Sequence, residues 1–144
     1  LVLIEKDQVA EYFTPLTLSK NKSVKAKAMR AILAVMKGGK CAICDKEIKN
    51  YNNLLRWHFD HLADLRHYKI SPITNMKQFR ISGNDIANRT WDIVVRHCRH
   101  DTQLLCKNCH FEKSMRDYDR EVHLAGAVDR ATRFIGGGWM IPPG

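Results

Sequence analysis

The stretch "LLCKNCHFEK", residues 104–113, decides the fold because it holds one of two cysteine pairs with the same spacing. The other pair lies in "KCAIC", residues 40–44, and 61 residues separate the two pairs. Two residues between cysteines let a tight turn aim both sulfurs at one ion, and two such turns supply the four thiolates of a closed zinc site. We therefore expect one structural Zn²⁺, with two unrelated pairs of buried thiols as the alternative. Its ligands would be Cys41, Cys44, Cys106 and Cys109.

Length and charge narrow the class of protein. The 144 residues suffice for one domain with a modest core, which a metal ion would help to stabilise. Lysine and arginine number 24 against 15 acidic residues, a formal charge of +9 that favours nucleic acid as the partner over an anionic membrane. The sequence has no run of 18 apolar residues and no signal-peptide pattern, so we expect an intracellular, cytoplasmic protein.

The order of patterns along the chain predicts a single α+β domain, 1–144, that is mainly helical. The stretch "VKAKAMRAILAVMK" has helical spacing between an N-cap at Ser23 and a stop at Gly38 and Gly39. Strands are expected in "LLRWHFDHL" and "DTQLLC", and helices in "SGNDIANRTWDIVVRH", capped by Ser82 or Asn84, and from Lys107 to about Tyr118. The expected parts are an N-terminal arm (1–22), a helix (23–39), a zinc-braced region (40–114) with a basic insert (63–99), and a C-terminal helix and tail (115–144).

If four sulfurs fill the zinc site, His110 is left over for a second site. The predicted strand "WHFDHL" offers His58, Asp60 and His61 within four residues, and the zinc would hold both ends of the insert close together. A carboxylate plus an imidazole suits Mg²⁺ or Mn²⁺ with open positions for water and phosphate oxygens. A neighbouring imidazole can take a proton from water at neutral pH. Taken singly, each histidine is more often a surface or structural residue.

These blocks together carry a family resemblance. "KCAIC", "HFDHL" and "LLCKNCHFEK" resemble the three blocks of the HNH endonucleases, whose ββα-metal finger is braced in one subgroup by a four-cysteine zinc. Their order is also similar to that in the phage recombination endonuclease VII group. The resemblance covers residues 40–114 and implies DNA hydrolysis with one divalent metal, to 5′ phosphates, in a bacterial or phage-like context. It assigns Asp60 and His110 as ligands of the catalytic Mg²⁺ or Mn²⁺ and His61 as the general base.

The resemblance also points to possible further site residues, and the sequence differs from the family pattern at two points. The middle asparagine of the family, which ties down the loop between the strands, would fall at Asp101, and aspartate lacks the amide donors. About 44 residues intervene between the predicted Asp-His strand and the second cysteine pair, more than in many relatives. His58 is either a further ligand or a packing residue. Lys113 either contacts the scissile phosphate or is an exposed helix lysine.

The basic insert is the expected DNA-binding region. Either its cations follow a phosphate backbone, or they are solvated charges of a basic protein while Trp91, Ile93 and Val94 bury one face of a helix. Two other functions remain open: a zinc-stabilised nucleic-acid-binding module without catalysis, and a protein-interaction zinc domain. One finger cuts one strand, so a double-strand cut would favour a homodimer. The candidate DNA contacts are Arg66, Lys69, Lys77, Arg80, Arg89, Arg96 and Arg99.

Overall fold

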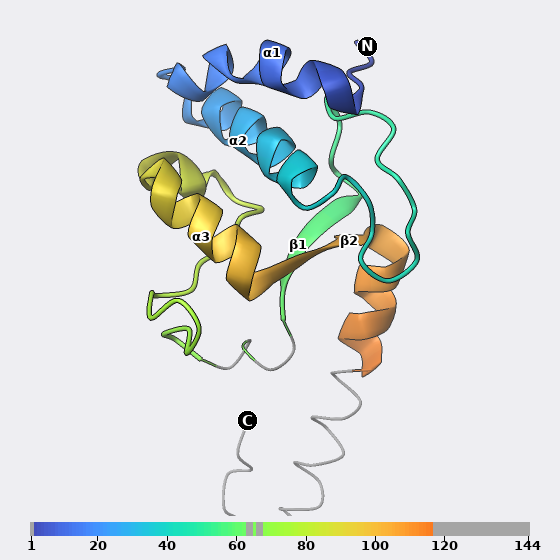
Figure 1. Cartoon of the computed structure of the whole chain (residues 1–144), viewed down its shortest axis with the longest axis vertical. Helices are drawn as coiled ribbons and strands as arrows, with labels where there is room; N and C mark the ends of the chain where they lie inside the picture. Colours follow the sequence, from blue (N-terminus) through green and yellow to red (C-terminus); the bar gives the residue numbers. More distant parts are fainter. Residues whose placement is uncertain (1, 63–64, 66–67, 117–144) are drawn as a thin grey trace, which may run out of the picture. The chain divides into compact units, whose positions relative to one another are not determined.

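The computed structural model describes residues 2–62, 65 and 68–116 (Figure 1). The chain divides into two units, Leu1–Cys109 and His110–Gly144, which are described separately. The first unit is α+β: helices surround a core beside a two-stranded antiparallel sheet, and four cysteines cluster together. Its elements are η1 (Lys6–Gln8), α1 (Val9–Phe13), η2 (Pro15–Leu18), α2 (Lys22–Met36), β1 (Trp57–His61), η3 (Asn84–Asn88), α3 (Trp91–Asp101) and β2 (Thr102–Cys106).

Helix α2 forms the centre of the core. Its N-cap is Asn21, whose Oδ1 accepts hydrogen bonds from the backbone N–H groups of Ser23 at 3.0 Å and Val24 at 3.3 Å. The prediction that Ser23 is the cap was therefore wrong by two residues. The predicted stop is confirmed, because Gly38 (φ +92°) and Gly39 (φ +70°) adopt the left-handed conformation that ends the helix. The buried residues of α2 are Ala26, Ala28, Met29, Ala31, Leu33 and Ala34.

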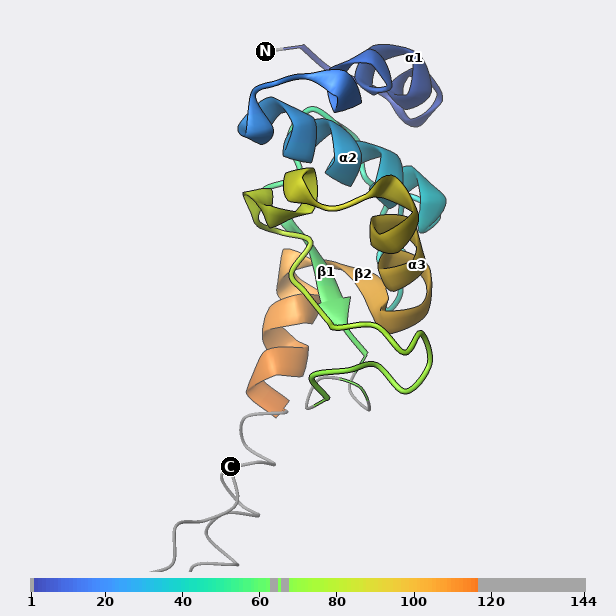
Figure 2. The same cartoon turned by 90° about the vertical axis from the view of Figure 1, so that its left-hand side faces the viewer.

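The N-terminal residues are part of the core, which corrects the prediction of a loosely defined arm. Ile4, Val9 and Phe13 are buried, and α1 packs against α2 (Figure 2). The backbone N–H of Tyr51 donates to the carbonyl of Ile4 at 2.9 Å, which fixes the start of the chain to the segment before β1. The sequence hid this because the apolar residues lie on several short helical turns and not on one long periodic helix.

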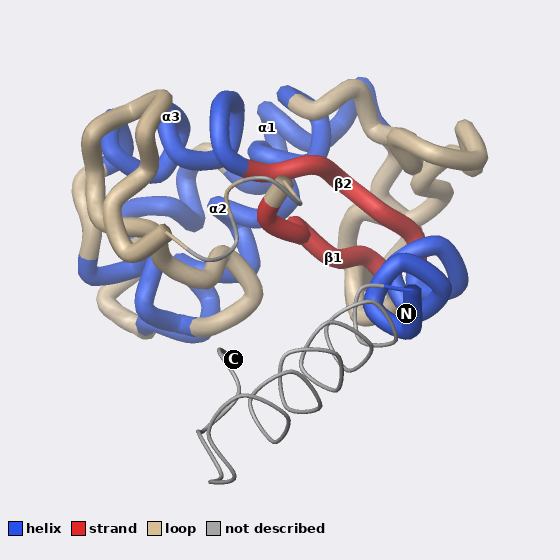
Figure 3. Tube along the Cα trace, turned by 90° about the horizontal axis from the view of Figure 1, so that it is seen from below, coloured by secondary structure: helices blue, strands red, loops and turns tan. Residues whose placement is uncertain are grey.

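Both predicted strands are confirmed. Strands β1 and β2 pair in antiparallel orientation, although 40 residues lie between them (Figure 3). Trp57 pairs with Cys106 at one end and His61 with Thr102 at the other. Strand β2 begins directly after α3, and the Thr102 hydroxyl donates to the Cys98 carbonyl at 2.8 Å across that junction. The middle of the sheet is anchored in the core by buried side chains from both strands, Phe59 and Leu104.

The insert between the strands does not contain the single helix expected over 82–97. The chain forms η3, passes through an extended Arg89, and begins α3 after an N-cap at Thr90. Neither predicted cap serves that role: the Ser82 carbonyl accepts from Arg30, and the Asn84 side chain donates to the Ser23 hydroxyl. Because Arg30 and Ser23 both belong to α2, these two hydrogen bonds connect the insert to α2.

The helix predicted from Lys107 is confirmed as far as residue 116. Residues 107–109 belong to the first unit and 110–116 to the second. The predicted stripe from Tyr118 to Ile135, and the tail after it, lie outside the described residues. Within the part of the chain that the structure describes, no helix is long and apolar enough to cross a membrane.

Candidate metal centre and active site

The two cysteine pairs meet in space, as the sequence predicted. The sulfurs of Cys41, Cys44, Cys106 and Cys109 all lie within 4.8 Å of one another, and the sulfurs of Cys44 and Cys106 are 3.7 Å apart. Two sulfurs bound to tetrahedral zinc at about 2.3 Å are about 3.8 Å apart. The donor set and its spacing therefore fit a four-thiolate zinc site.

Local backbone geometry builds the first cysteine turn. Lys40 and Glu47 form an isolated antiparallel bridge, and the N–H of Cys41 donates to the Lys46 carbonyl at 2.8 Å. Asp45 (φ 62°) takes the left-handed conformation that closes the turn. The N–H of Ala42 donates to the carbonyl of Leu104 in β2 at 2.9 Å. The backbone itself thus brings this turn to the strand that delivers the second cysteine pair.

Cys41 and Cys109 differ in how readily their thiols ionise. Burial opposes ionisation of Cys41, but backbone N–H groups of Cys44, Cys106 and Ile43 more than compensate and lower its pKa to about 6. Burial and the neighbouring sulfurs raise the pKa of Cys109. Once one thiolate has formed, further negative charge in the cluster needs a compensating cation. This is the behaviour expected of a site that binds its metal with release of protons.

The fifth cysteine has no place in this cluster. Cys98 is fully buried in the core on α3, and burial raises its pKa to about 11. A buried thiol of this kind is unreactive and packs as a small apolar side chain.

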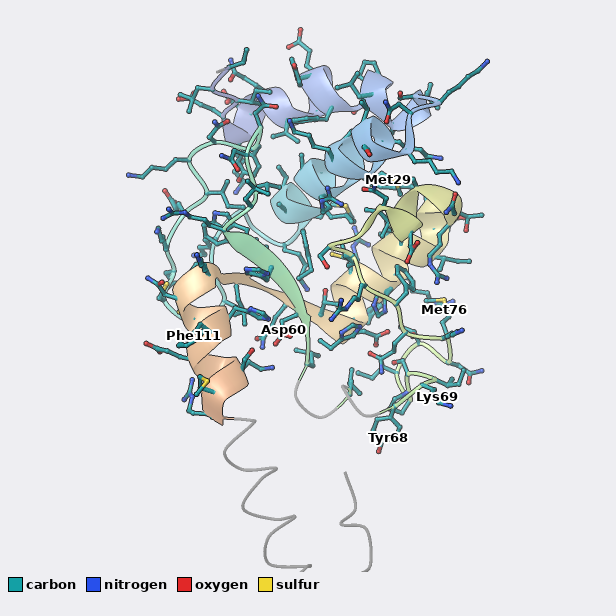
Figure 4. The ribbon with its side chains drawn as sticks, turned by 180° about the vertical axis from the view of Figure 1, so that it is seen from behind. Met29, Asp60, Tyr68, Lys69, Met76 and Phe111 are labelled. Atoms are coloured by element: carbon teal, nitrogen blue, oxygen red, sulfur yellow. The ribbon has the colours of Figure 1, made fainter. Side chains whose placement is uncertain are left out.

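The predicted catalytic pair lies at the C-terminal end of β1. Because strand side chains alternate, His61 shares the face of the buried Phe59, whereas Asp60 and His58 are on the other face. Figure 4 shows Asp60 projecting from the strand. His58 is half-buried and, with Lys27, lines a cavity of about 450 Å³.

The environment of His61 favours its neutral form. Its pKa is lowered, first by burial and second by the charge of His97, with Asp60 acting in the opposite direction. The Nε2 atoms of His61 and His97 are 3.2 Å apart. A neutral imidazole is the form that can accept a proton from water.

Asp101 is fully buried and binds the loop between the strands. It accepts hydrogen bonds from the hydroxyls of Ser71 at 2.6 Å and Thr74 at 3.0 Å, and it pairs with His97 at 2.9 Å. Burial opposes ionisation of Asp101, but these three hydrogen bonds outweigh it and lower the pKa of the carboxyl. Asp101 thus holds the loop by accepting hydrogen bonds and does not need the amide donors of asparagine.

Sequence reasoning missed His97. It is fully buried on α3, one turn before Asp101, and it contacts both Asp101 and His61. The available signal was the spacing of four residues between a histidine and an aspartate on a predicted helix. That signal is weak, because such pairs are usually exposed.

The remaining predicted site residues have varied surroundings. His110 and Lys113 are half-buried in the second unit, so their pairing with Asp60 at one metal ion stays a prediction. Arg66 lies outside the described residues. The guanidinium of Arg89 lies over the Phe79 ring at 4.1 Å, so Arg89 has a packing role. The exposed candidates for DNA contact are Lys69, Lys77, Arg80, Arg96 and Arg99.

Comparisons with known proteins do not identify a relative. No protein-family model matches the chain, and neither a curated protein nor a solved structure matches it.

Proposed function

We propose that the protein is a divalent-metal-dependent DNA endonuclease of the HNH type, with a ββα-metal finger braced by a structural zinc ion. One observation carries the proposal. Asp60 and His61 stand at one end of the β1–β2 pair, whose other end joins the four-cysteine cluster, and a helix follows β2 directly. This combines, in one strand-strand-helix unit, the residue types that phosphodiester hydrolysis needs.

In the proposed mechanism His61 accepts a proton from the attacking water. Its lowered pKa keeps it neutral, and Asp101 holds the adjoining loop. Asp60 and His110 would bind the catalytic Mg²⁺ or Mn²⁺, since a carboxylate and an imidazole suit these ions. The bound ion would neutralise the scissile phosphate and stabilise the departing 3′ oxygen. Lys113 and His58 are candidates for further contact with the phosphate or the ion.

The exposed cations of the insert support DNA as the substrate. Arg96 and Arg99 lie on one face of α3 and line a shallow cavity of about 380 Å³ with Trp91. Two guanidinium groups beside an aromatic ring suit contact with a nucleic-acid backbone and an adjacent base. The same cations also support the alternative function, a zinc-stabilised nucleic-acid-binding module without catalysis.

Plasmid cleavage separates the two functions. Purified zinc-loaded protein is incubated with supercoiled plasmid, with no added metal, with Mg²⁺ and with Mn²⁺. The nuclease proposal expects nicked or linear product only with added metal. Plasmid that binds but stays supercoiled in every condition would favour the binding module. Linear product that appears without a nicked intermediate would further indicate a dimer that cuts both strands.

A further inference from the structure

The insert contains a turn, residues 69–78, that has the same backbone hydrogen bonds as the first cysteine turn, residues 39–48. Each turn has an isolated antiparallel bridge, which joins residues 70 and 77 in the insert and residues 40 and 47 in the cysteine turn. Three further backbone hydrogen bonds of the cysteine turn recur in the insert 30 positions later. In the insert they run from the N–H of Ser71 to the carbonyl of Met76, from Asn75 to Ser71, and from Gln78 to Lys69, at 2.8–2.9 Å.

Hydroxyl groups occupy the positions of the two cysteines in this second turn, which we call the hydroxyl turn. Ser71 and Thr74 donate to the two carboxylate oxygens of the buried Asp101, at 2.6 Å and 3.0 Å. The next residue, Asn75 (φ 56°), takes the left-handed conformation that Asp45 (φ 62°) has in the cysteine turn. The carboxylate thus holds the hydroxyl turn in one conformation, in the way that a metal ion holds a cysteine turn.

The hydroxyl turn presents apolar side chains to solvent. Ile73 is 56% exposed and Ile70 is 50% exposed, and Pro72 between them is exposed as well. We call these three residues the apolar tip. Figure 1 shows the turn, in yellow-green, at the edge of the first unit, and Figure 4 shows the neighbouring Tyr68 and Lys69 at the same edge. Apolar side chains that gather on an exposed turn indicate an interaction site. Because the turn is already held in place, little conformational entropy is lost when the tip binds a partner.

The charge around the apolar tip indicates the partner. The sequence has no aspartate or glutamate in residues 65–84, and Lys69, Lys77 and Arg80 are exposed there. A surface of one sign beside an apolar tip is complementary to DNA, whose phosphates flank an apolar stack of bases. Isoleucine and proline are among the side chains that insert between base steps in DNA-binding proteins.

We propose that the hydroxyl turn is a wedge for duplex DNA, in which Ile73 inserts between two base pairs while Lys69 and Lys77 contact the flanking phosphates. This inference rests on DNA as the substrate in the proposed function. The anchor of the wedge adjoins the end of β1, because the N–H of Leu62 donates to the backbone carbonyl of Asp101 at 2.9 Å. The wedge therefore distorts the duplex beside the strand end that carries the proposed catalytic residues.

Fluorescence of 2-aminopurine in duplex DNA tests the wedge without any cleavage. This base pairs with thymine and is quenched while it is stacked, so its emission rises when a base step opens. The duplex carries 2-aminopurine in repeated TA steps, which unstack most readily, and no divalent metal is added. The parent should raise the emission at saturation. Ile73→Ser should lose most of this rise with little change in affinity, because phosphate contacts supply most of the affinity and the cost of unstacking offsets the gain from insertion.

Leu3→Ser is the matched control. Leu3 is 60% exposed, close to the value for Ile73, but it shares a surface hollow with the acidic Glu11. This variant should keep both the affinity and the emission of the parent. A parent that binds the duplex without a rise in emission, or an Ile73→Ser variant with the parent's full rise, overturns the wedge and leaves the nuclease proposal standing.

Two further measurements separate the remaining outcomes. If sedimentation of the DNA-free parent shows a dimer and Ile73→Ser is a monomer, the apolar tip is an interface between two copies of the chain, and the wedge is overturned. A parent that binds no duplex at any salt concentration overturns the wedge together with DNA as the substrate. A parent with a rise in emission that depends on Ile73, but with no cleavage when Mg²⁺ or Mn²⁺ is added, supports the wedge and favours the DNA-binding module over the nuclease.

Discussion

Cys106→Ser is expected to destabilise the whole fold, because the four-cysteine cluster joins segments that are far apart in sequence. Zinc bound to all four sulfurs closes a loop with 61 residues between Cys44 and Cys106. In the chain-entropy model, a constraint on a loop of this length is worth about 4 kcal/mol. Domains of this size have a free energy of unfolding of about 5–15 kcal/mol, so this one contribution is a large part of the total. Its removal corresponds to a fall in melting temperature of about 15 °C or more.

Two measurements on the same samples check this prediction. Mass spectrometry of metals should find one zinc per chain in the parent and less in Cys106→Ser. The midpoint of thermal unfolding, followed by circular dichroism, should be lower in Cys106→Ser by about 15 °C or more. Cys98→Ser is the matched control, because Cys98 is buried in the core outside the cluster and should leave one zinc per chain. A Cys106→Ser protein with one tightly held zinc and the parent's melting temperature would refute the reasoning.

Two further predictions concern the core and the charged surface. Phe13→Ala should lower the free energy of unfolding by about 3–5 kcal/mol in a denaturant titration, because Phe13 is buried in the core; a decrease below about 1 kcal/mol would restore the view of residues 1–22 as an arm. Arg96→Ala with Arg99→Ala should weaken DNA binding and flatten the plot of log affinity against log salt by about one unit for each phosphate that is no longer neutralised. Lys20→Ala with Lys22→Ala, which removes the same charge from exposed positions at and just before the start of α2, should keep the parent's slope. If the two double variants have the same slope, the DNA does not contact Arg96 and Arg99.

The cluster and the sheet could be predicted because their signals are local and strict. The spacing of each cysteine pair fixes a tight turn, and the apolar runs around Phe59 and Leu104 predict two strands. The stop of α2 was equally clear, since two consecutive glycines favour the left-handed conformation. At position 39 glycine is also favoured for a second reason, because a Cβ atom there would collide with the Tyr51 hydroxyl.

The features that the sequence did not predict depend on tertiary contacts. Asn21 caps α2 because its side chain reaches two backbone N–H groups, and Ser23 in turn bonds the distant Asn84. The insert helix begins only at Trp91, since the preceding residues form η3 and an extended link. The buried contact of His97 with the strand end has no sequence pattern at all, because it joins residues 36 positions apart.

The central claim, that Asp60 and His61 perform metal-dependent DNA hydrolysis, is tested most directly by plasmid cleavage across a titration of Mg²⁺ and Mn²⁺. His61→Ala should bind metal and DNA normally but cleave about 10²- to 10⁴-fold more slowly at every metal concentration. Asp60→Ala should recover part of its activity as the metal concentration rises, and Glu11→Gln, at an exposed residue of α1 outside the proposed site, should behave as the parent. Cleavage by His61→Ala at the parent's rate and with the parent's metal dependence would contradict the nuclease proposal and favour a zinc-stabilised DNA-binding module.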